Sequence, residues 1–191
     1  MFRRSFTAFA VTAAALSAAA LSAVASDLAA QDAVALAIAP IPTETEQATA
    51  KVIQKQGDEW VTLREGAGPF ICIADDPAAD GFHSACYHTS LEPYMARGRE
   101  LTSQGTVGRP NVEQRMAEIE AGTLEMPSYA FLHAIYAAEG WSGDMDAVQR
   151  HQSVIYTPFA TAEDLGLPTR ATRGAWLMAA GTANAHVMIT P

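Results

Sequence analysis

The chain has 191 residues, and its 21 acidic residues against 12 basic ones give a formal net charge of −9 at pH 7. Such an acidic chain has no basic surface that could neutralise phosphates, which argues against nucleic acid as a partner. The length suffices for one domain with a sizeable core, but not comfortably for two.

The first 25 residues have the features of a secretory signal peptide. Arg3 and Arg4 form a short basic region, residues 6–20 are uncharged and rich in alanine, and residues 23–25 read AVA, which fits the cleavage rule. Cleavage leaves 166 of the 191 residues, with 10 basic residues against 21 acidic ones and a net charge of −11. We therefore expect a periplasmic or secreted domain, residues 26–191, with no membrane span after cleavage.

The N-terminal part of this domain begins with a helix and continues with strands. Residues 26–40 favour a short helix that Pro40 ends. Two β-rich runs, residues 50–53 and 60–63, flank a polar turn and predict a β-hairpin. Residues 70–74 form an apolar run of strand length. These segments predict a small antiparallel unit.

Two amphipathic helices are predicted in the middle of the chain, over residues 89–105 and 111–122. Thr89 and Glu92 have the spacing of a capping box at the start of the first helix, and Asn111 has the position of an N-cap in the second. The apolar face of the first helix consists of Leu91, Tyr94, Met95 and Leu101.

The C-terminal half returns to strands, which we expect within residues 129–137, 152–159, 175–181 and 185–191. The polar insert between the first two, residues 138–150, is predicted to be a surface loop. The fold class we predict is α+β: a single domain with an antiparallel or mixed sheet of about five to six strands and the two amphipathic helices on one face.

The chain contains two cysteines, Cys72 and Cys86. In an exported protein two cysteines most often pair, so we predict a disulfide that clips the intervening loop onto the rim of the sheet. Closing a loop of about 15 residues stabilises the fold by roughly 3 kcal/mol in the chain-entropy model. A catalytic dithiol is less favoured, because such pairs usually have two residues between the cysteines.

The segment Cys72–Thr89 also holds potential metal ligands or catalytic groups, namely His83, His88, Asp75 and Asp76. Their spacing matches no zinc pattern, and the two aspartates equally suit a turn in which they accept hydrogen bonds from backbone amides. A metal-dependent protein or hydrolase-type enzyme with its site in this segment is therefore the alternative function. It requires His83 and His88 to converge on one cleft.

Two further residues have both a structural and a functional interpretation. His133 lies in the middle of a predicted strand, where it is either a half-buried structural residue or part of a site. Trp141 lies in the polar insert, where it either covers the core or makes an exposed contact with a partner.

Motifs of the common nucleophiles, zinc proteases and nucleotide-binding loops are missing from the sequence, and no cofactor is predicted. The favoured function is a non-catalytic, exported binding or cell-envelope-associated domain. Its partner would be an envelope component, a small molecule or a protein.

Several short motifs, taken in their order, resemble a group of small exported bacterial proteins of unknown function. A Leu-Arg-Glu-Gly turn at residues 63–66 precedes the cysteine strand FICIADDP at residues 70–77. SQG at residues 103–105 and YTPFATAEDLGLP at residues 156–168 follow, and the chain ends in AHVMITP at residues 185–191. The resemblance covers nearly the whole mature chain and implies one exported domain. It brings no activity, cofactor or catalytic residue with it.

Overall fold

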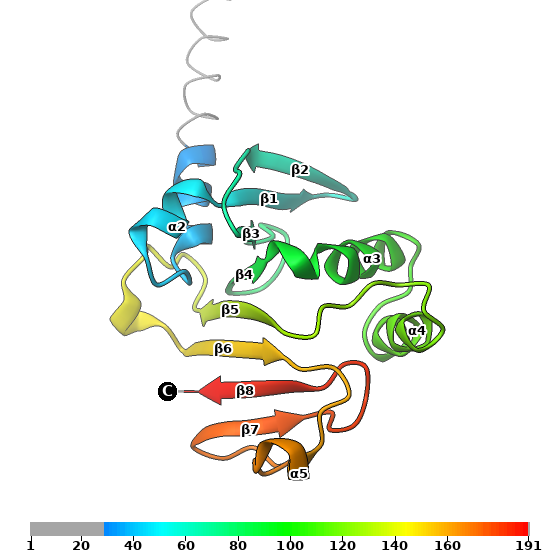
Figure 1. The fold of residues 1–191 in the computed structure, drawn as a ribbon. Coiled ribbons are helices and arrows are strands. Elements are labelled where there is room, and N and C mark those ends of the chain that lie inside the picture. Colours follow the sequence, from blue (N-terminus) through cyan, green and yellow to red (C-terminus); the bar gives the residue numbers. More distant parts are fainter. Residues whose placement is uncertain (1–28, 191) are drawn as a thin grey trace, which may run out of the picture.

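The computed structural model describes residues 29–190, whose main feature is one eight-stranded mixed sheet (Figure 1). The strands lie in the order β2-β1-β3-β4-β5-β6-β8-β7, and all neighbours are antiparallel except the parallel pair β1 and β3. Their bounds are β1 Lys51–Gln56, β2 Glu59–Arg64, β3 Phe70–Ile73, β4 Phe82–His88, β5 Ala130–Ala137, β6 Arg150–Tyr156, β7 Gly174–Met178 and β8 His186–Thr190.

The helical segments complete an α+β fold, as predicted. They are an N-terminal helix at residues 29–38, α2 Glu44–Thr49, α3 Glu92–Ser103, α4 Arg109–Glu120 and α5 Ala162–Leu165, with 3-10 turns η1 Thr89–Leu91 and η2 Met145–Ala147. The predicted signal peptide, residues 1–25, lies outside the described residues. Within residues 29–190, none of the helices is both long enough and apolar enough to cross a membrane.

The sheet is larger than the five to six strands expected from the sequence, and β4 is a strand where we expected a loop. β4 lies in the middle of the sheet, and its four consecutive residues from Ser84 to Tyr87 are all buried. A strand that is covered on both faces has no reason to alternate between apolar and polar residues. The period-2 signal that identifies a half-exposed strand is therefore missing from FHSACYH.

Helices cover both faces of the sheet in its β1–β5 half. Successive side chains of a strand point to opposite faces, so each of these strands contributes to both layers of packing. On one face, which we call the N-terminal-helix face, Ala37 and Ile41 pack against Val52, Phe70, Cys72 and Cys86. On the other, the α3 face, Leu91 and Met95 pack against Ile53, Ile71 and Tyr87. The expected helix pair thus covers one face through α3, with α4 packed on α3, and the N-terminal helix covers the other.

The predicted capping box of the first amphipathic helix is wrong. The N-cap of α3 is Leu91, which makes no side-chain cap, because the chain enters the helix through the turn η1. Nδ1 of His88 accepts the Ser90 N–H at the start of that turn. Glu92, freed from capping, accepts hydrogen bonds from the Tyr87 hydroxyl and the Arg99 guanidinium, both at 2.5 Å.

The predicted N-cap of the second helix is also wrong. Asn111 lies inside α4, which begins at Arg109, and its side chain is buried. Its amide nitrogen donates to the carbonyl oxygens of Gly98 and Thr106, both at 2.9 Å. Asn111 therefore joins α4 to α3 instead of ending a helix.

Candidate functional site

The predicted disulfide is present, with Cys72 of β3 bonded to Cys86 of β4. The two residues are direct cross-strand partners with Cα atoms 4.0 Å apart, and both are fully buried. Sγ of Cys86 lies 3.2 Å from the carbonyl oxygen of Ala37 in the N-terminal helix. The bond therefore staples two central strands under a helix, and not a loop to the rim of the sheet as expected. Neither sulfur is a free thiolate that could bind a metal.

His83 and His88 do not converge on a shared cleft. They are five residues apart on β4, so their side chains lie on opposite faces of the sheet, roughly 16 Å apart along the strand at about 3.3 Å per residue. His83 stacks on Tyr136 at 4.3 Å, and the Arg150 guanidinium lies 3.8 Å from the centre of the same ring. The pKa of His83 is lowered overall. Burial is the main cause, Asp75 opposes it, and Arg150 adds to it.

Both aspartates accept hydrogen bonds from backbone amides, Asp76 within a turn and Asp75 across the loop to β4. Oδ1 of Asp75 accepts the backbone N–H of His83 at 2.8 Å, and Oδ1 of Asp76 accepts that of Ala78 at 3.0 Å. Oδ2 of Asp76 also pairs with Nζ of Lys55 at 3.1 Å. Across residues 29–190, no three His, Cys, Asp or Glu side chains are arranged to hold a metal ion.

Trp141 is a core residue and not an exposed contact. Only 7% of it is exposed, its ring lies 4.7 Å from that of Phe82, and Nε1 donates to the Asp144 carbonyl at 2.7 Å. It packs with Leu36 of the N-terminal helix at one end of the sheet. The covering role that the sequence left open is therefore the one observed.

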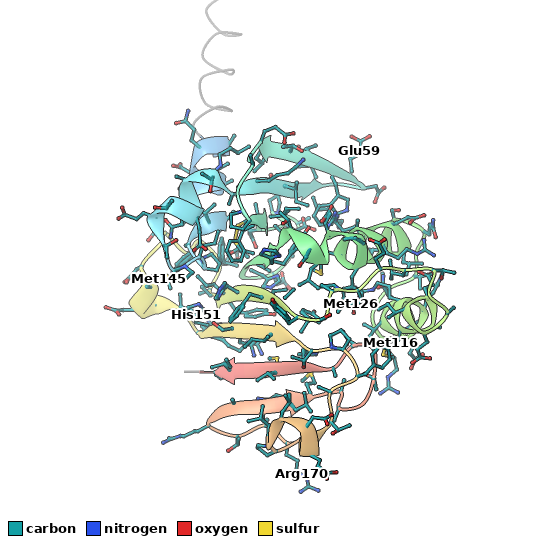
Figure 2. All side chains as sticks on the ribbon, viewed as in Figure 1. Glu59, Met116, Met126, Met145, His151 and Arg170 are labelled. Atoms are coloured by element: carbon teal, nitrogen blue, oxygen red, sulfur yellow. A yellow bond between two sulfur atoms is a disulfide. The ribbon has the colours of Figure 1, made fainter. Side chains whose placement is uncertain are left out.

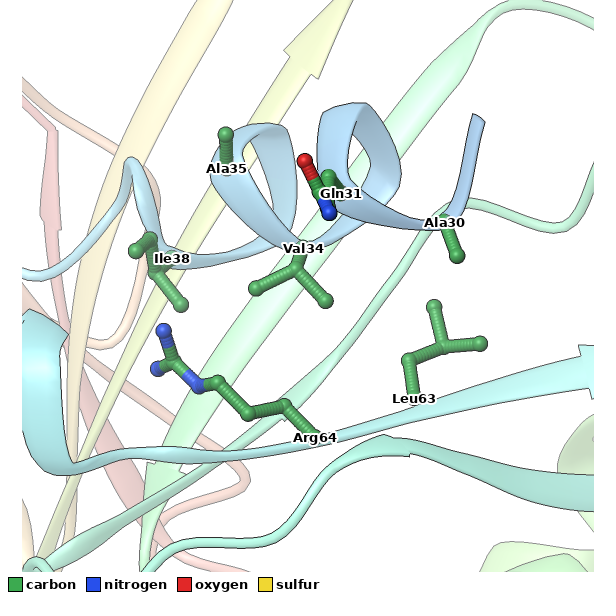
Figure 3. A pocket seen from close by; sticks show the side chains of 7 residues that line it. All are labelled: Ala30, Gln31, Val34, Ala35, Ile38, Leu63 and Arg64. Atoms are coloured by element: carbon green, nitrogen blue, oxygen red, sulfur yellow. The ribbon is translucent and has the colours of Figure 1, made fainter. Parts of the chain in front are cut away.

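A hollow of about 430 Å³ lies between the N-terminal helix and β2, and Val34 and Ile38 point into it toward Leu63 and Arg64 (Figure 3). Its one charged side chain is already used in the fold. The Arg64 guanidinium donates to the carbonyl oxygens of Ala50 at 2.8 Å and of Gln47 at 2.5 Å. This hollow therefore offers a ligand little besides apolar surface and one amide, that of Gln31.

A larger pocket, of about 480 Å³, lies on the N-terminal-helix face beside α2. We call it the aromatic pocket, and it is lined by Pro42, Glu46, Pro69, Phe70, His88, Tyr129, Ala130, Phe131 and His133. Two of its rings are unusually accessible for large apolar side chains, since Tyr129 is 76% exposed and Phe131 is 40% exposed. A concave, mainly apolar site with a few polar groups is the usual form of a small-molecule pocket.

The rings of the aromatic pocket form a row across strands β3, β4 and β5. The Phe70 ring lies 6.2 Å from that of His88, edge to face, and 5.9 Å from that of His133. His133 in turn stacks on Phe131 at 5.6 Å. The row lies beside the disulfide on the same face of the sheet, because Cys86 is the cross-strand partner of His133. The fold thus fixes these rings on a rigid part of the sheet.

The two histidines of the row have different hydrogen bonds. Ser90 N–H donates to Nδ1 of His88 at 3.2 Å, which leaves the ring proton of the neutral form on Nε2. Nδ1 of His133 lies 3.1 Å from the Ser153 hydroxyl. The pKa of His133 is lowered overall. Burial is the main cause, nearby His151 adds to it, and Glu46 opposes it. Figure 2 shows His151 at the start of β6, the strand that also carries Ser153.

The sequence indicated only part of this pocket. His133 was a candidate, and His88 was a candidate for a different site, whereas Glu46, Tyr129 and Phe131 were not identified. The one local signal was the i, i+2 spacing of Phe131 and His133 in a predicted strand, which places both side chains on one face.

No protein-family model, curated protein or solved structure matches the chain.

Proposed function

We propose that the protein is an exported, non-catalytic binding domain and that the aromatic pocket holds a small, largely apolar ligand. The observation that carries the proposal is the row of rings, Phe70, His133 and Phe131, along the wall of a 480 Å³ pocket. That volume falls in the range of roughly 300–1,000 Å³ that is usual for small-molecule sites. The exposed faces of Tyr129 and Phe131 would be removed from water by the ligand, which is favourable in proportion to the apolar area covered.

Rigidity of the pocket also supports binding. Phe70 and His88 are cross-strand partners two residues from the disulfide pair, so the strands that carry them are covalently joined. A site whose side chains are already held in place loses little conformational entropy when it binds.

Export is the second part of the proposal. The leader-like residues 1–25, the buried disulfide, and the motifs that resemble small exported bacterial proteins all support it. Expression with the native leader should yield a protein outside the cytoplasm whose N-terminus, by mass spectrometry, is Ser26. An uncleaved chain that remains in the cytoplasm would contradict export.

Binding can be tested with N-phenyl-1-naphthylamine, a neutral aromatic probe whose fluorescence rises in apolar surroundings. We expect saturable binding that Phe131→Ala weakens about tenfold. Met178→Ala is the matched control, because Met178 is similarly exposed, at 39%, but lies on the distant edge strand β7. Equal binding by both variants, or no saturable binding, would contradict the proposed site.

A further inference from the structure

The charge of the aromatic pocket is negative. Its nine described lining residues include one carboxylate, that of Glu46, and neither lysine nor arginine. The ion pairs found within residues 29–190 do not involve Glu46. One of its oxygens, Oε2, accepts the Thr43 hydroxyl at 2.6 Å, which leaves Oε1 available. Glu46 is half-buried, so this carboxylate is partly removed from water without a cationic partner.

Of the two histidines that line the pocket, His133 does little to balance this charge, because burial lowers its pKa. The whole chain is acidic as well, with a net charge of −9. An anionic ligand would be repelled by Glu46, and a neutral ligand would leave the charge of the Glu46 carboxylate without a partner.

The remaining walls of the pocket suit a cation. Phe70, Tyr129 and Phe131 are three aromatic side chains around one hollow. The face of an aromatic ring attracts a cation within about 6 Å of its centre, and this attraction increases when the site excludes water. Several rings with one carboxylate form a common recognition site for substituted ammonium groups, which are too apolar to be well hydrated.

We infer that the ligand is an organic cation whose substituted ammonium group lies between the rings of Phe70, Tyr129 and Phe131 and the carboxylate of Glu46. This inference rests on the proposed function, since it names the class of ligand for the same pocket. The Nε2–H of His88 would be free to donate a hydrogen bond to an oxygen elsewhere in the ligand.

The test compares choline with 3,3-dimethylbutan-1-ol, in which carbon replaces the charged nitrogen and the shape is retained. Binding of each compound is measured by NMR titration of the labelled mature protein. We expect choline to bind about tenfold more tightly than the alcohol, with shift changes centred on the lining residues. Equal affinities, or tighter binding of the alcohol, would overturn the inference.

Glu46→Gln removes the charge and keeps the shape of the side chain. We expect choline to bind about tenfold more weakly to this variant, with the affinity for the alcohol unchanged. Glu44→Gln is the control, because it changes the net charge equally from an exposed position on the same helix and does not line the pocket. Unchanged binding of the alcohol also demonstrates that the pocket of Glu46→Gln is intact.

The outcomes separate the two proposals. If choline shows no preference over the alcohol, or if both glutamine variants behave alike while N-phenyl-1-naphthylamine still binds, the cation inference fails and the binding pocket stands. If choline, the alcohol and N-phenyl-1-naphthylamine all fail to bind, the proposed function fails together with the inference.

Discussion

Removing the Cys72–Cys86 disulfide should cost about 3 kcal/mol of unfolding free energy. The bond closes a loop of 15 residues, given its sequence separation of 14, and this is the value of the chain-entropy model for such a loop. For a chain of this size, 1 kcal/mol shifts the melting temperature by roughly 2–4 °C, so the shift should be about 6–12 °C. The assay is urea unfolding of a protein that comprises residues 26–191, followed by tryptophan fluorescence, with and without dithiothreitol.

The variant Cys72→Ala/Cys86→Ala complements this assay, because it cannot reoxidise. It also removes two fully buried sulfurs, so it should be slightly less stable than the reduced natural protein. Because both cysteines are inaccessible to solvent, reduction of the folded protein should be slow and should accelerate in urea near the unfolding transition. A stability difference below about 1 kcal/mol, or rapid reduction without denaturant, would refute this account of the bond.

Two further predictions concern close packing and acid stability. Gly66→Ala should lower the unfolding free energy by more than 2 kcal/mol in the same urea assay, because a Cβ there would lie 2.5 Å from the backbone nitrogen of Lys51. Gly98→Ala should cost much less, because its Cβ meets the flexible Arg115 side chain and alanine favours the helix; equal losses would contradict the packing argument. Burial lowers the pKa of His83, His133 and His186. The unfolded chain therefore binds protons more readily, so the unfolding free energy should fall as the pH drops below about 6.5; a flat profile between pH 7 and 5 would contradict this.

The secondary structure that could be predicted from the sequence is the part with a clear local signal. The hairpin of β1 and β2 consists of two β-rich runs around a polar turn, and the apolar residues of α3 gather on one side of the helix. β4 was missed because helices cover both of its faces, which removes the alternation and favours the small residues Ser84 and Ala85. The order of the strands could not be predicted either. The position of β8 between β6 and β7 depends on pairing between strands that are distant in sequence, which no local pattern indicates.

The helix starts were predicted wrongly for a related reason. Thr89, Glu92 and Asn111 have the right residue types and spacing for caps. However, Thr89 lies in the turn η1, and the side chains of Glu92 and Asn111 make tertiary hydrogen bonds. Glu92 bonds to Tyr87 and Arg99 across the gap between α3 and the sheet, and such a partner, distant in sequence, is invisible to a local capping rule.

The aromatic pocket depends on strand register, which explains both why the sequence could not reveal it and why it is rigid. Six of its nine lining residues come from α2, β3, β4 and β5, and they meet because Phe70 pairs with His88 while Cys86 pairs with both Cys72 and His133. A slip of one residue between β3 and β4 would move Phe70 out of line with His88 and would separate the two sulfurs. The disulfide forbids that slip, so the bond that stabilises the fold also fixes the relative positions of the rings that we propose to bind the ligand.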